Sequence, residues 1–203
     1  MIAFPRVFVA AVSLFLATTA WSGDFQTGLD AFNSANYAGA LTEWQPLADA
    51  GDANGQYGLG LLYSNGFGVD LNDEQALKNY GLASEQGHAG AQYNLGVMHQ
   101  NGWGVPMNEE EAARLFLMAA ESGHVDAQIG LGQIYAADYS PLYDKAKAYK
   151  WLGIATQLGN MNAAVARDTL AENLTSDEVL EYEGAVNSWM EAHGGMFASD
   201  DEY

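Results

Sequence analysis

The order of apolar and polar residues predicts a series of helices, each about twelve residues long. Ala91, Leu95 and Met98 recur at helical spacing, which predicts a helix over residues 89–100. The run Asn101-Gly102-Trp103-Gly104 then breaks the helical pattern, as paired glycines do.

A second helix is predicted directly after this break. Asn108 is a good N-cap, and Glu109 to Glu111 place negative charge in the first turn, where the helix dipole favours it. Gly123 is predicted to end this helix in the left-handed conformation. The unit therefore consists of a helix, a glycine-containing loop, a second helix and a tight turn. The predicted inner stripe of the second helix is formed by Ala112, Leu115, Phe116 and Ala119.

The same pattern recurs every 36 residues, which is typical of a stacked array of one supersecondary unit. The repeated glycines Gly60, Gly96 and Gly132 fall inside the first helices, where each costs about 1 kcal/mol of helix stability relative to alanine. Such a cost predicts that a neighbouring helix packs where no Cβ intrudes. The repeated positions are Gly51, Gly87, Gly123 and Gly159; Ala40, Ala76, Ala112 and Ala148; Gln56, Gln92 and Gln128; and Gly60, Gly96 and Gly132.

The array predicted at residues 51–172 is flanked by less regular segments. Residues 23–50 form a degenerate N-terminal capping unit, in which Pro46 predicts a kink or an early helix stop. Residues 161–172 form the first helix of a decaying fourth unit.

A final helix is predicted within residues 173–193, opened by a capping box of Thr175 and Glu178. It either covers the open end of the array, as terminal caps do, or docks a partner. Residues 194–203 are interpreted as a loose acidic tail. The predicted apolar face of the final helix is formed by Val179, Tyr182, Val186 and Trp189.

The first 22 residues have the pattern of a cleaved secretory signal. Arg6 precedes an apolar run from Val7 to Ala17, and cleavage is expected after Ala20 or Ser22. The alternative is an uncleaved anchor. No later apolar stretch approaches the roughly 20 residues of a membrane span. The expected product is a soluble protein without stable membrane insertion, exported to the periplasm or the exterior of a Gram-negative bacterium.

The net charge of the chain limits the kinds of partner that it is expected to bind. Loss of Arg6 leaves six basic against 26 acidic residues, so the net charge becomes 6 − 26 = −20. This disfavours nucleic acid and anionic lipid, and favours a protein partner with a basic surface. Alternatively, the acidic residues only keep the protein soluble and monomeric. The chain has no cysteine and therefore no disulfide.

Residues 55–69 read Gly-Gln-Tyr-Gly-Leu-Gly-Leu-Leu-Tyr-Ser-Asn-Gly-Phe-Gly-Val, and residues 91–105 and 127–135 repeat the theme. Over residues 36–172 this motif resembles the Sel-one-like repeat, a branch of the tetratricopeptide-like solenoids. The resemblance implies an all-α fold, a right-handed α/α superhelix of 36-residue two-helix repeats. It also implies an adaptor role in exported or membrane-associated complexes.

No catalytic residue, metal site or cofactor is predicted. His88 and His124 share one repeat position with Asp52 and Asn160, which favours a turn role, and His99 replaces a repeated tyrosine. The helix-borne zinc motif, the Ser-x-x-Lys motif and the Gly-x-Ser-x-Gly elbow are all absent from the sequence. Some cysteine-rich relatives are linked to β-lactam binding, and the lack of cysteine argues against carrying that activity over.

The leading hypothesis is an adaptor of the periplasm or cell envelope that binds a partner in a concave groove lined by the first helices, regulating an envelope sensor or an assembly. The alternatives are a cell-wall-directed hydrolase or β-lactam-binding protein, and a structural envelope protein without a defined partner. A second candidate patch in the third loop is either a partner site or a drifted repeat, and consists of Tyr139, Tyr143 and Lys147. The predicted groove residues are Asn54, Tyr57, Leu61, Tyr93, Asn94, Val97, Ile129 and Gln133.

Overall fold

The structure, a computed structural model, describes residues 23–194 of the chain. The predicted signal sequence and residues 195–203 of the predicted tail lie outside the described residues. Within residues 23–194 all regular structure is helical. The helices are α1 (Phe25–Asn33), α2 (Tyr37–Asp49), α3 (Ala53–Asn65), α4 (Asp73–Glu85), α5 (Ala89–Asn101), α6 (Glu109–Glu121), α7 (Val125–Ala136), α8 (Lys145–Gln157), α9 (Met161–Ala171) and α10 (Ser176–His193).

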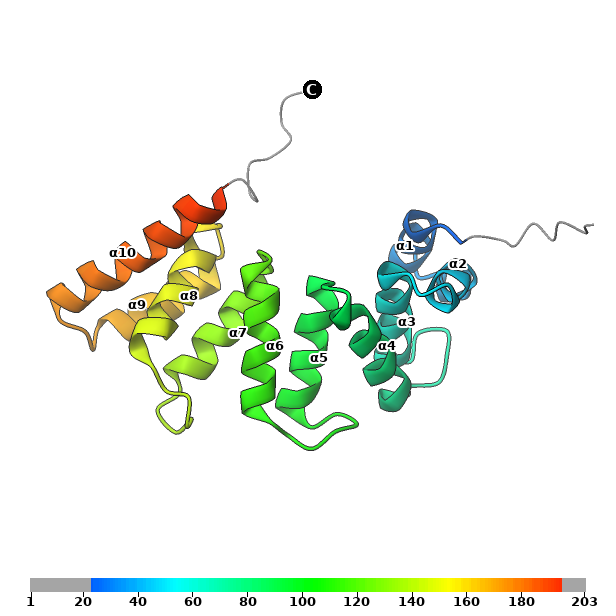
Figure 1. The fold of residues 1–203 in the computed structure, drawn as a ribbon, viewed down its shortest axis with the longest axis horizontal. Coiled ribbons are helices and arrows are strands. Elements are labelled where there is room, and N and C mark those ends of the chain that lie inside the picture. Colours follow the sequence, from blue (N-terminus) through cyan, green and yellow to red (C-terminus); the bar gives the residue numbers. More distant parts are fainter. Residues whose placement is uncertain (1–22, 195–203) are drawn as a thin grey trace, which may run out of the picture.

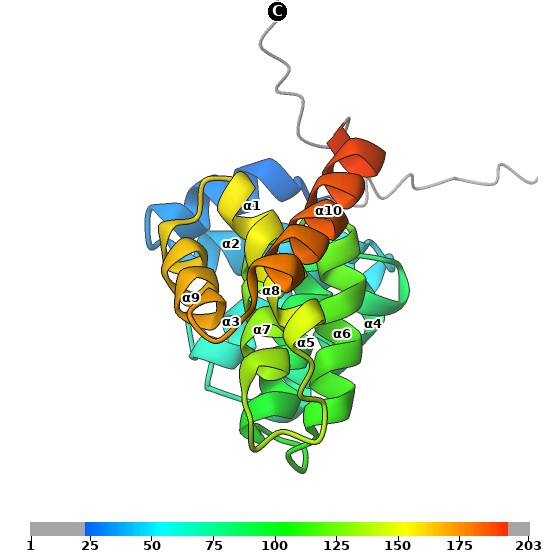
Figure 2. The same cartoon turned by 90° about the vertical axis from the view of Figure 1, so that its left-hand side faces the viewer.

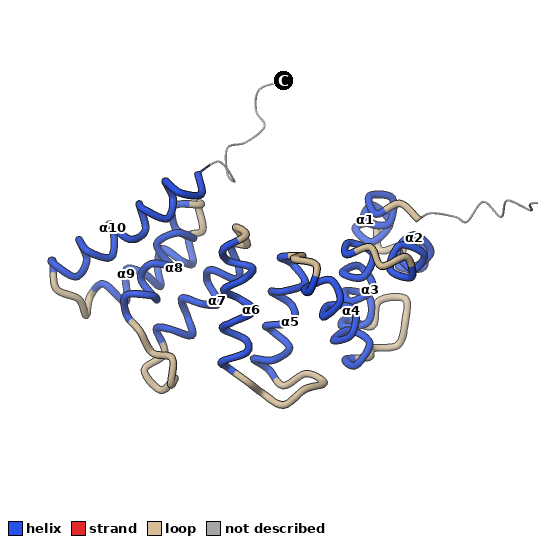
Figure 3. The backbone as a smooth tube through the Cα atoms, in the orientation of Figure 1, coloured by secondary structure: helices blue, strands red, loops and turns tan. Residues whose placement is uncertain are grey.

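The helices pack in consecutive pairs that follow an arc (Figure 1). Pairs α3–α4, α5–α6 and α7–α8 are the 36-residue units, and the second helix of each unit also packs on the first helix of the next. The three long loops inside these units lie along the outer edge of the arc (Figure 3). The predicted solenoid of two-helix repeats is therefore confirmed, and the predicted helix at residues 89–100 corresponds to α5.

In each tight turn between units, the residue after the glycine both closes the preceding helix and caps the next one. At the end of α4, Gly87 has φ +85° and the N–H of His88 donates to the carbonyl of Ala83, which closes the helix in a Schellman motif. The His88 side chain then caps α5 by accepting from the N–H of Ala91. The same pair of bonds is made around Asp52, His124 and Asn160. This dual role explains why the period is strict at these turns.

The glycines inside the first helices allow the close approach that the sequence predicts. A Cβ on Gly96 would lie 2.7 Å from the ring of Phe116, which is buried in the second helix of the same unit. Ala112, one turn earlier on that helix, is fully buried. The same contact joins Gly60 to Tyr80 and Gly132 to Leu152, each at 2.5 Å.

The N-terminal pair α1–α2 packs on α3 through Trp44, whose ring is fully buried. The Trp44 Nε1–H donates to the carbonyl of Phe25 at 3.2 Å, so the indole is satisfied while it fills the space beside Gly28 and Gly58. Of the kink or early stop predicted at Pro46, the early stop is wrong, because α2 continues to Asp49. Pro46 has no N–H to donate to the preceding turn, but its carbonyl still accepts from the N–H of Ala50 at 3.1 Å, so the helix closes after it.

Each long loop packs on the preceding unit. The Phe67 ring stacks on Tyr37 at the start of α2, with centroids 4.5 Å apart, and Gly104 lies against Asp73 at the start of α4. The third loop replaces the glycine with Ser140, whose hydroxyl donates to Glu109 Oε2 at 2.8 Å. A side-chain hydrogen bond therefore takes the place of a close backbone contact.

The C-terminal end departs from the regular pairing. Both α9 and α10 pack on α8, and Figure 2 shows them on opposite sides of it. The predicted capping box of Thr175 and Glu178 opens α10. Val186 is fully buried, and the ring of Trp189 meets that of Trp151 edge-on at 5.9 Å. The final helix thus docks on its own chain.

Candidate protein-binding surface

Two hollows lie between successive first helices. The hollow between α5 and α7 has a volume of about 310 Å³ and is lined by Tyr93 and Val97 from α5 and by Ile129 and Gln133 from α7. All four are residues that the sequence predicts for the groove. Asp126 lies in the same lining, with Gln100, Phe116, Gly130, Asn160 and Asn162.

The hollow between α3 and α5 is smaller, about 140 Å³. Its lining includes Leu61 from α3, Asn94 and Val97 from α5, and Trp103 from the loop that follows α5. Val97 lines both hollows, so the two are neighbours on one face. We call this surface, lined by the residues of the two hollows, the groove face.

Six of the eight predicted groove residues therefore line the groove face. The other two do not: Asn54 is exposed near the start of α3, and Tyr57 packs against His88 and is mostly buried. Asp126, Asn162 and Trp103 are among the lining residues that the sequence pattern did not predict for the groove. The period could have found the first two, since adding 36 to Asn54 twice and three times gives Asp126 and Asn162.

The two tyrosines are held by ring stacking on the histidines of the tight turns. Tyr57 lies 4.3 Å from His88 and Tyr93 lies 4.7 Å from His124, measured between ring centroids. Burial raises the pKa of Tyr57, which a hydrogen bond with Asn94 partly offsets. Burial also raises the pKa of Tyr93, and the nearby Asp126 carboxylate adds to the effect. Both phenols are therefore neutral hydrogen-bonding groups at physiological pH.

The groove face carries little charge for so acidic a chain. Asp126 is the one acidic or basic residue among the described residues that line the two hollows. The remaining side chains are aliphatic, aromatic, hydroxyl or carboxamide. Such a surface offers apolar contact together with adaptable hydrogen bonds, a combination that suits a protein segment.

The second predicted patch is not brought together as one site. Tyr139 and Tyr143 line separate hollows, and Lys147 lines neither. Lys147 instead pairs with Asp144 at 3.1 Å and lies over the ring of Tyr135. The three residues share a loop and the start of α8 without facing a common point.

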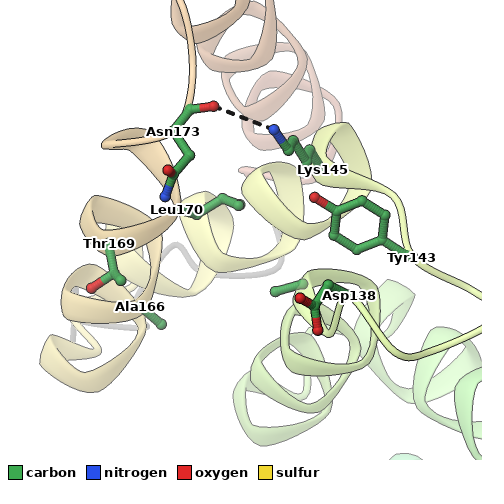
Figure 4. Close-up of a pocket in the computed structure, with 8 residues that line it drawn as sticks. Asp138, Tyr143, Lys145, Ala166, Thr169, Leu170 and Asn173 are labelled. Carbon is green, nitrogen blue, oxygen red and sulfur yellow. Dashed lines mark hydrogen bonds between the residues drawn. The ribbon is translucent and has the colours of Figure 1, made fainter.

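Tyr143 lines a hollow of about 460 Å³ between the third loop and α9 (Figure 4). Asp138, Tyr143 and Lys145 face Thr169 and Leu170 across this hollow. Lys145 Nζ donates to the carbonyl of Asn173 at 3.3 Å, which ties α8 to the end of α9. Its lining side chains do not include a nucleophile paired with a general base.

Histidine side chains in the repeats cap helices or lie within them. His88 and His124 each cap a helix through Nδ1, at 3.1 Å and 3.3 Å from the donor nitrogen, and they lie in different turns. His99 is half-buried in α5, and its Nδ1 makes no hydrogen bond. Over residues 23–194, no three His, Cys, Asp or Glu side chains are grouped so that they could hold a metal ion.

Comparison with known proteins agrees with this architecture. Three copies of the Sel1 repeat match residues 53–88, 89–124 and 125–160, more than half of the chain. The chain belongs to the Sel1 repeat family. The matched units begin at α3, α5 and α7, so each one contains a first helix, a long loop, a second helix and the turn that follows.

Two solved structures of Sel1 repeat proteins resemble this one. A Sel1 repeat protein from Oxalobacter formigenes is 32% identical with a TM-score of 0.58, and the match covers 64% of this chain and 97% of that one. The second is c5321, described as a protective antigen of uropathogenic Escherichia coli with an SLR fold. It is 25% identical with a TM-score of 0.53, over 88% of this chain and 48% of that one. The search of curated proteins found no match.

No helix of this Sel1 repeat protein between residues 23 and 194 combines the length and the apolar character that crossing a membrane requires.

Proposed function

We propose that this Sel1 repeat protein is a non-enzymatic adaptor that binds a segment of a partner protein on the groove face. Sel1 repeat proteins are generally protein-interaction scaffolds. The observation that carries the proposal is the shared lining of the two hollows by Val97, which joins three successive first helices into one receptor surface.

The lining indicates what kind of segment fits. Ile129, Val97 and Leu61 supply aliphatic contact, and Asn94 and Gln133 supply amide donors and acceptors beside them. Because the hollows measure only about 310 and 140 Å³, binding energy has to be summed over both of them, with a few anchors dominating. The proposed ligand is an extended or helical segment that crosses both hollows and carries apolar side chains at spaced positions.

We propose further that the adaptor works in the cell envelope. The support is the signal-like pattern of residues 1–22, followed by a strongly acidic chain without cysteine. Mass spectrometry of the protein from fractionated cells tests this proposal, since the N-terminus in the periplasmic fraction should be Trp21 or Gly23. An unprocessed Met1 in the cytoplasmic fraction would contradict it.

Affinity purification tests the groove face directly. Val97→Arg places a long charged side chain where both hollows meet and should abolish capture of the partner that the wild-type chain retains. Met118→Arg is the control, because Met118 is exposed on α6 and lines neither hollow. Equal capture by wild type and Val97→Arg, with both variants folded, would refute the groove as the binding surface.

A further inference from the structure

The three long loops carry two apolar positions that recur with the repeat period. The first is aromatic in every unit, as Phe67, Trp103 and Tyr139, and the second is large and apolar in every unit, as Leu71, Met107 and Tyr143. The side chains at these positions make none of the recurring loop hydrogen bonds, which use backbone groups and the N-caps Asn72, Asn108 and Asp144.

Five of these six side chains are on the surface. Phe67 is the exception, since it stacks on Tyr37. The exposed fractions of the others are 64% for Leu71, 52% for Trp103, 74% for Met107, 86% for Tyr139 and 42% for Tyr143. Single exposed apolar residues are ordinary, but a row of them at matched positions along one edge of an array is a feature of recognition surfaces. We call these five residues the loop edge.

Part of the loop edge borders a hollow. Met107 from the second loop and Tyr139 from the third line a space of about 680 Å³, with Gln100, Asn101 and Glu109. The Ser140 hydroxyl donates to Glu109, which holds the third loop beside the start of α6. The hollow therefore has walls supplied by two successive units.

The charge around the first two loops is of one sign. Residues 66–75 contain Asp70, Asp73 and Glu74, residues 102–111 contain Glu109, Glu110 and Glu111, and neither segment contains a basic residue. Glu111 is occupied by Arg114 from the next turn of α6, at 2.6 Å. The other five carboxylates make no ion pair among the described residues, and four of them lie in the first turns of α4 and α6. The edge therefore presents negative charge beside apolar side chains.

We infer that the loop edge is a second docking surface, and that its occupant is a basic amphipathic segment of a protein. Charge complementarity selects the class of ligand: Lys and Arg of the segment meet the carboxylates of the first two loops, and its apolar side chains cover Leu71, Met107 and Tyr139. An anionic membrane surface would be repelled by the same carboxylates. The two surfaces meet at Trp103, and the other four residues of the loop edge line neither hollow of the groove face, so one adaptor can hold two partners.

A displayed-peptide selection tests this inference. A random 12-residue phage library is panned on the processed wild-type chain and counter-selected on Met107→Ser/Tyr139→Ser, in which both removed side chains are largely exposed and the fold should be unaffected. The enriched peptides should combine Lys or Arg with aromatic or aliphatic residues. As synthetic peptides they should bind wild type at least tenfold more tightly than the double variant, and more weakly in 500 mM than in 50 mM salt.

Two further variants separate this surface from the groove face. Val97→Ser should leave the affinity of the selected peptides unchanged, whereas Glu74→Gln/Glu110→Gln should weaken it and reduce its salt dependence. The inference is overturned if no enriched peptide depends on Met107 and Tyr139, if the enriched peptides are acidic or uncharged, or if anionic vesicles bind wild type and compete with the peptides. A loss with Val97→Ser equal to that with the loop variant would place the peptides in the groove and would likewise overturn it.

Discussion

The ring of His88 stacks on Tyr57 with 4.3 Å between centroids, while its Nδ1 accepts a hydrogen bond from the N–H of Ala91 at 3.1 Å. His124 repeats both contacts with Tyr93 and Ala127. Nδ1 can accept only when it carries no proton, so both caps require neutral imidazole. Two successive first helices therefore start on groups that titrate near neutral pH.

Stability should fall as the pH drops from 7 to 5. Desolvation lowers the pKa of His88 and His124 below 6.5, and it outweighs the opposing effects of Asp52 on His88 and Asp126 on His124. In the window below 6.5 the unfolded chain therefore binds more protons than the folded one, and stability decreases with falling pH. Loss of the two caps should cost about 1 kcal/mol each. Thermal unfolding followed at pH 7, 6 and 5 measures the effect.

The chain supplies the control for this prediction, since Asn160 caps α9 at the equivalent position. In His88→Asn/His124→Asn the caps remain but no longer titrate, so the loss between pH 7 and 5 should shrink. Carboxylates such as Asp144, whose pKa is lowered mainly by hydrogen bonds from Lys147 against the effect of burial, act in a separate window below about pH 4. An unchanged pH dependence in the double variant would show that the histidines are not responsible.

Ser122→Gln should stabilise the fold. Gln56 Oε1 accepts from Gln86 Nε2 at 2.7 Å, but the equivalent oxygen of Gln92 is buried without a partner, because Ser122 stands where the earlier unit has Gln86. Restoring the donor should gain about 1 kcal/mol. For a domain of this size that corresponds to a rise in Tm of about 2–4 °C. Ser122→Glu, which has the same length and no donor, should give no gain, and a gain shared by both variants would point to helix propensity instead.

Alanine should have opposite effects at two helical glycines. At Gly81 a Cβ would meet nothing within 4 Å, so Gly81→Ala should stabilise by about 0.5–1 kcal/mol through helix propensity. At Gly96 it would lie 2.7 Å from the buried Phe116 ring, and Gly96→Ala should destabilise by about 1–3 kcal/mol. Denaturant unfolding of both variants gives the comparison. Equal shifts of the same sign would mean that the helix pair does not need close approach.

Gly153→Ala should loosen α10 without unfolding the array. The new Cβ would lie 2.6 Å from Val186 Cγ2, at the centre of the contact between α8 and α10. Hydrogen exchange in residues 176–193 should become about tenfold faster, while exchange in α5 and α6 stays unchanged. Gly184→Ala is the control, because Gly184 lies on α10 and a Cβ there would meet nothing within 4 Å. Equally faster hydrogen exchange throughout the chain would show instead that α10 unfolds only together with the rest of the array.

The sequence predicted those features that depend on spacing. The tight turns, the buried glycines and the inner stripes all follow from the 36-residue period, because the same contact has to be made again in each unit. Six of the eight groove residues follow for the same reason. The unpartnered oxygen of Gln92 and the docking of α10 on α8 depend on residues that break the repeat or lie outside it, so the period does not predict them. The early stop expected at Pro46 did not occur, because a proline removes only its own N–H and the carbonyl of Pro46 still accepts from Ala50.

Photo-crosslinking in the cell tests the central claim most directly. A photoreactive phenylalanine at Val97, where the two hollows meet, should join the adaptor to one partner protein, and the same substitution at Ile129 should give the same adduct. At Met118, on the outward face of α6, it should not. An adduct formed at Met118 but at neither groove position, or different proteins caught at Val97 and Ile129, would contradict a single receptor surface built from successive first helices.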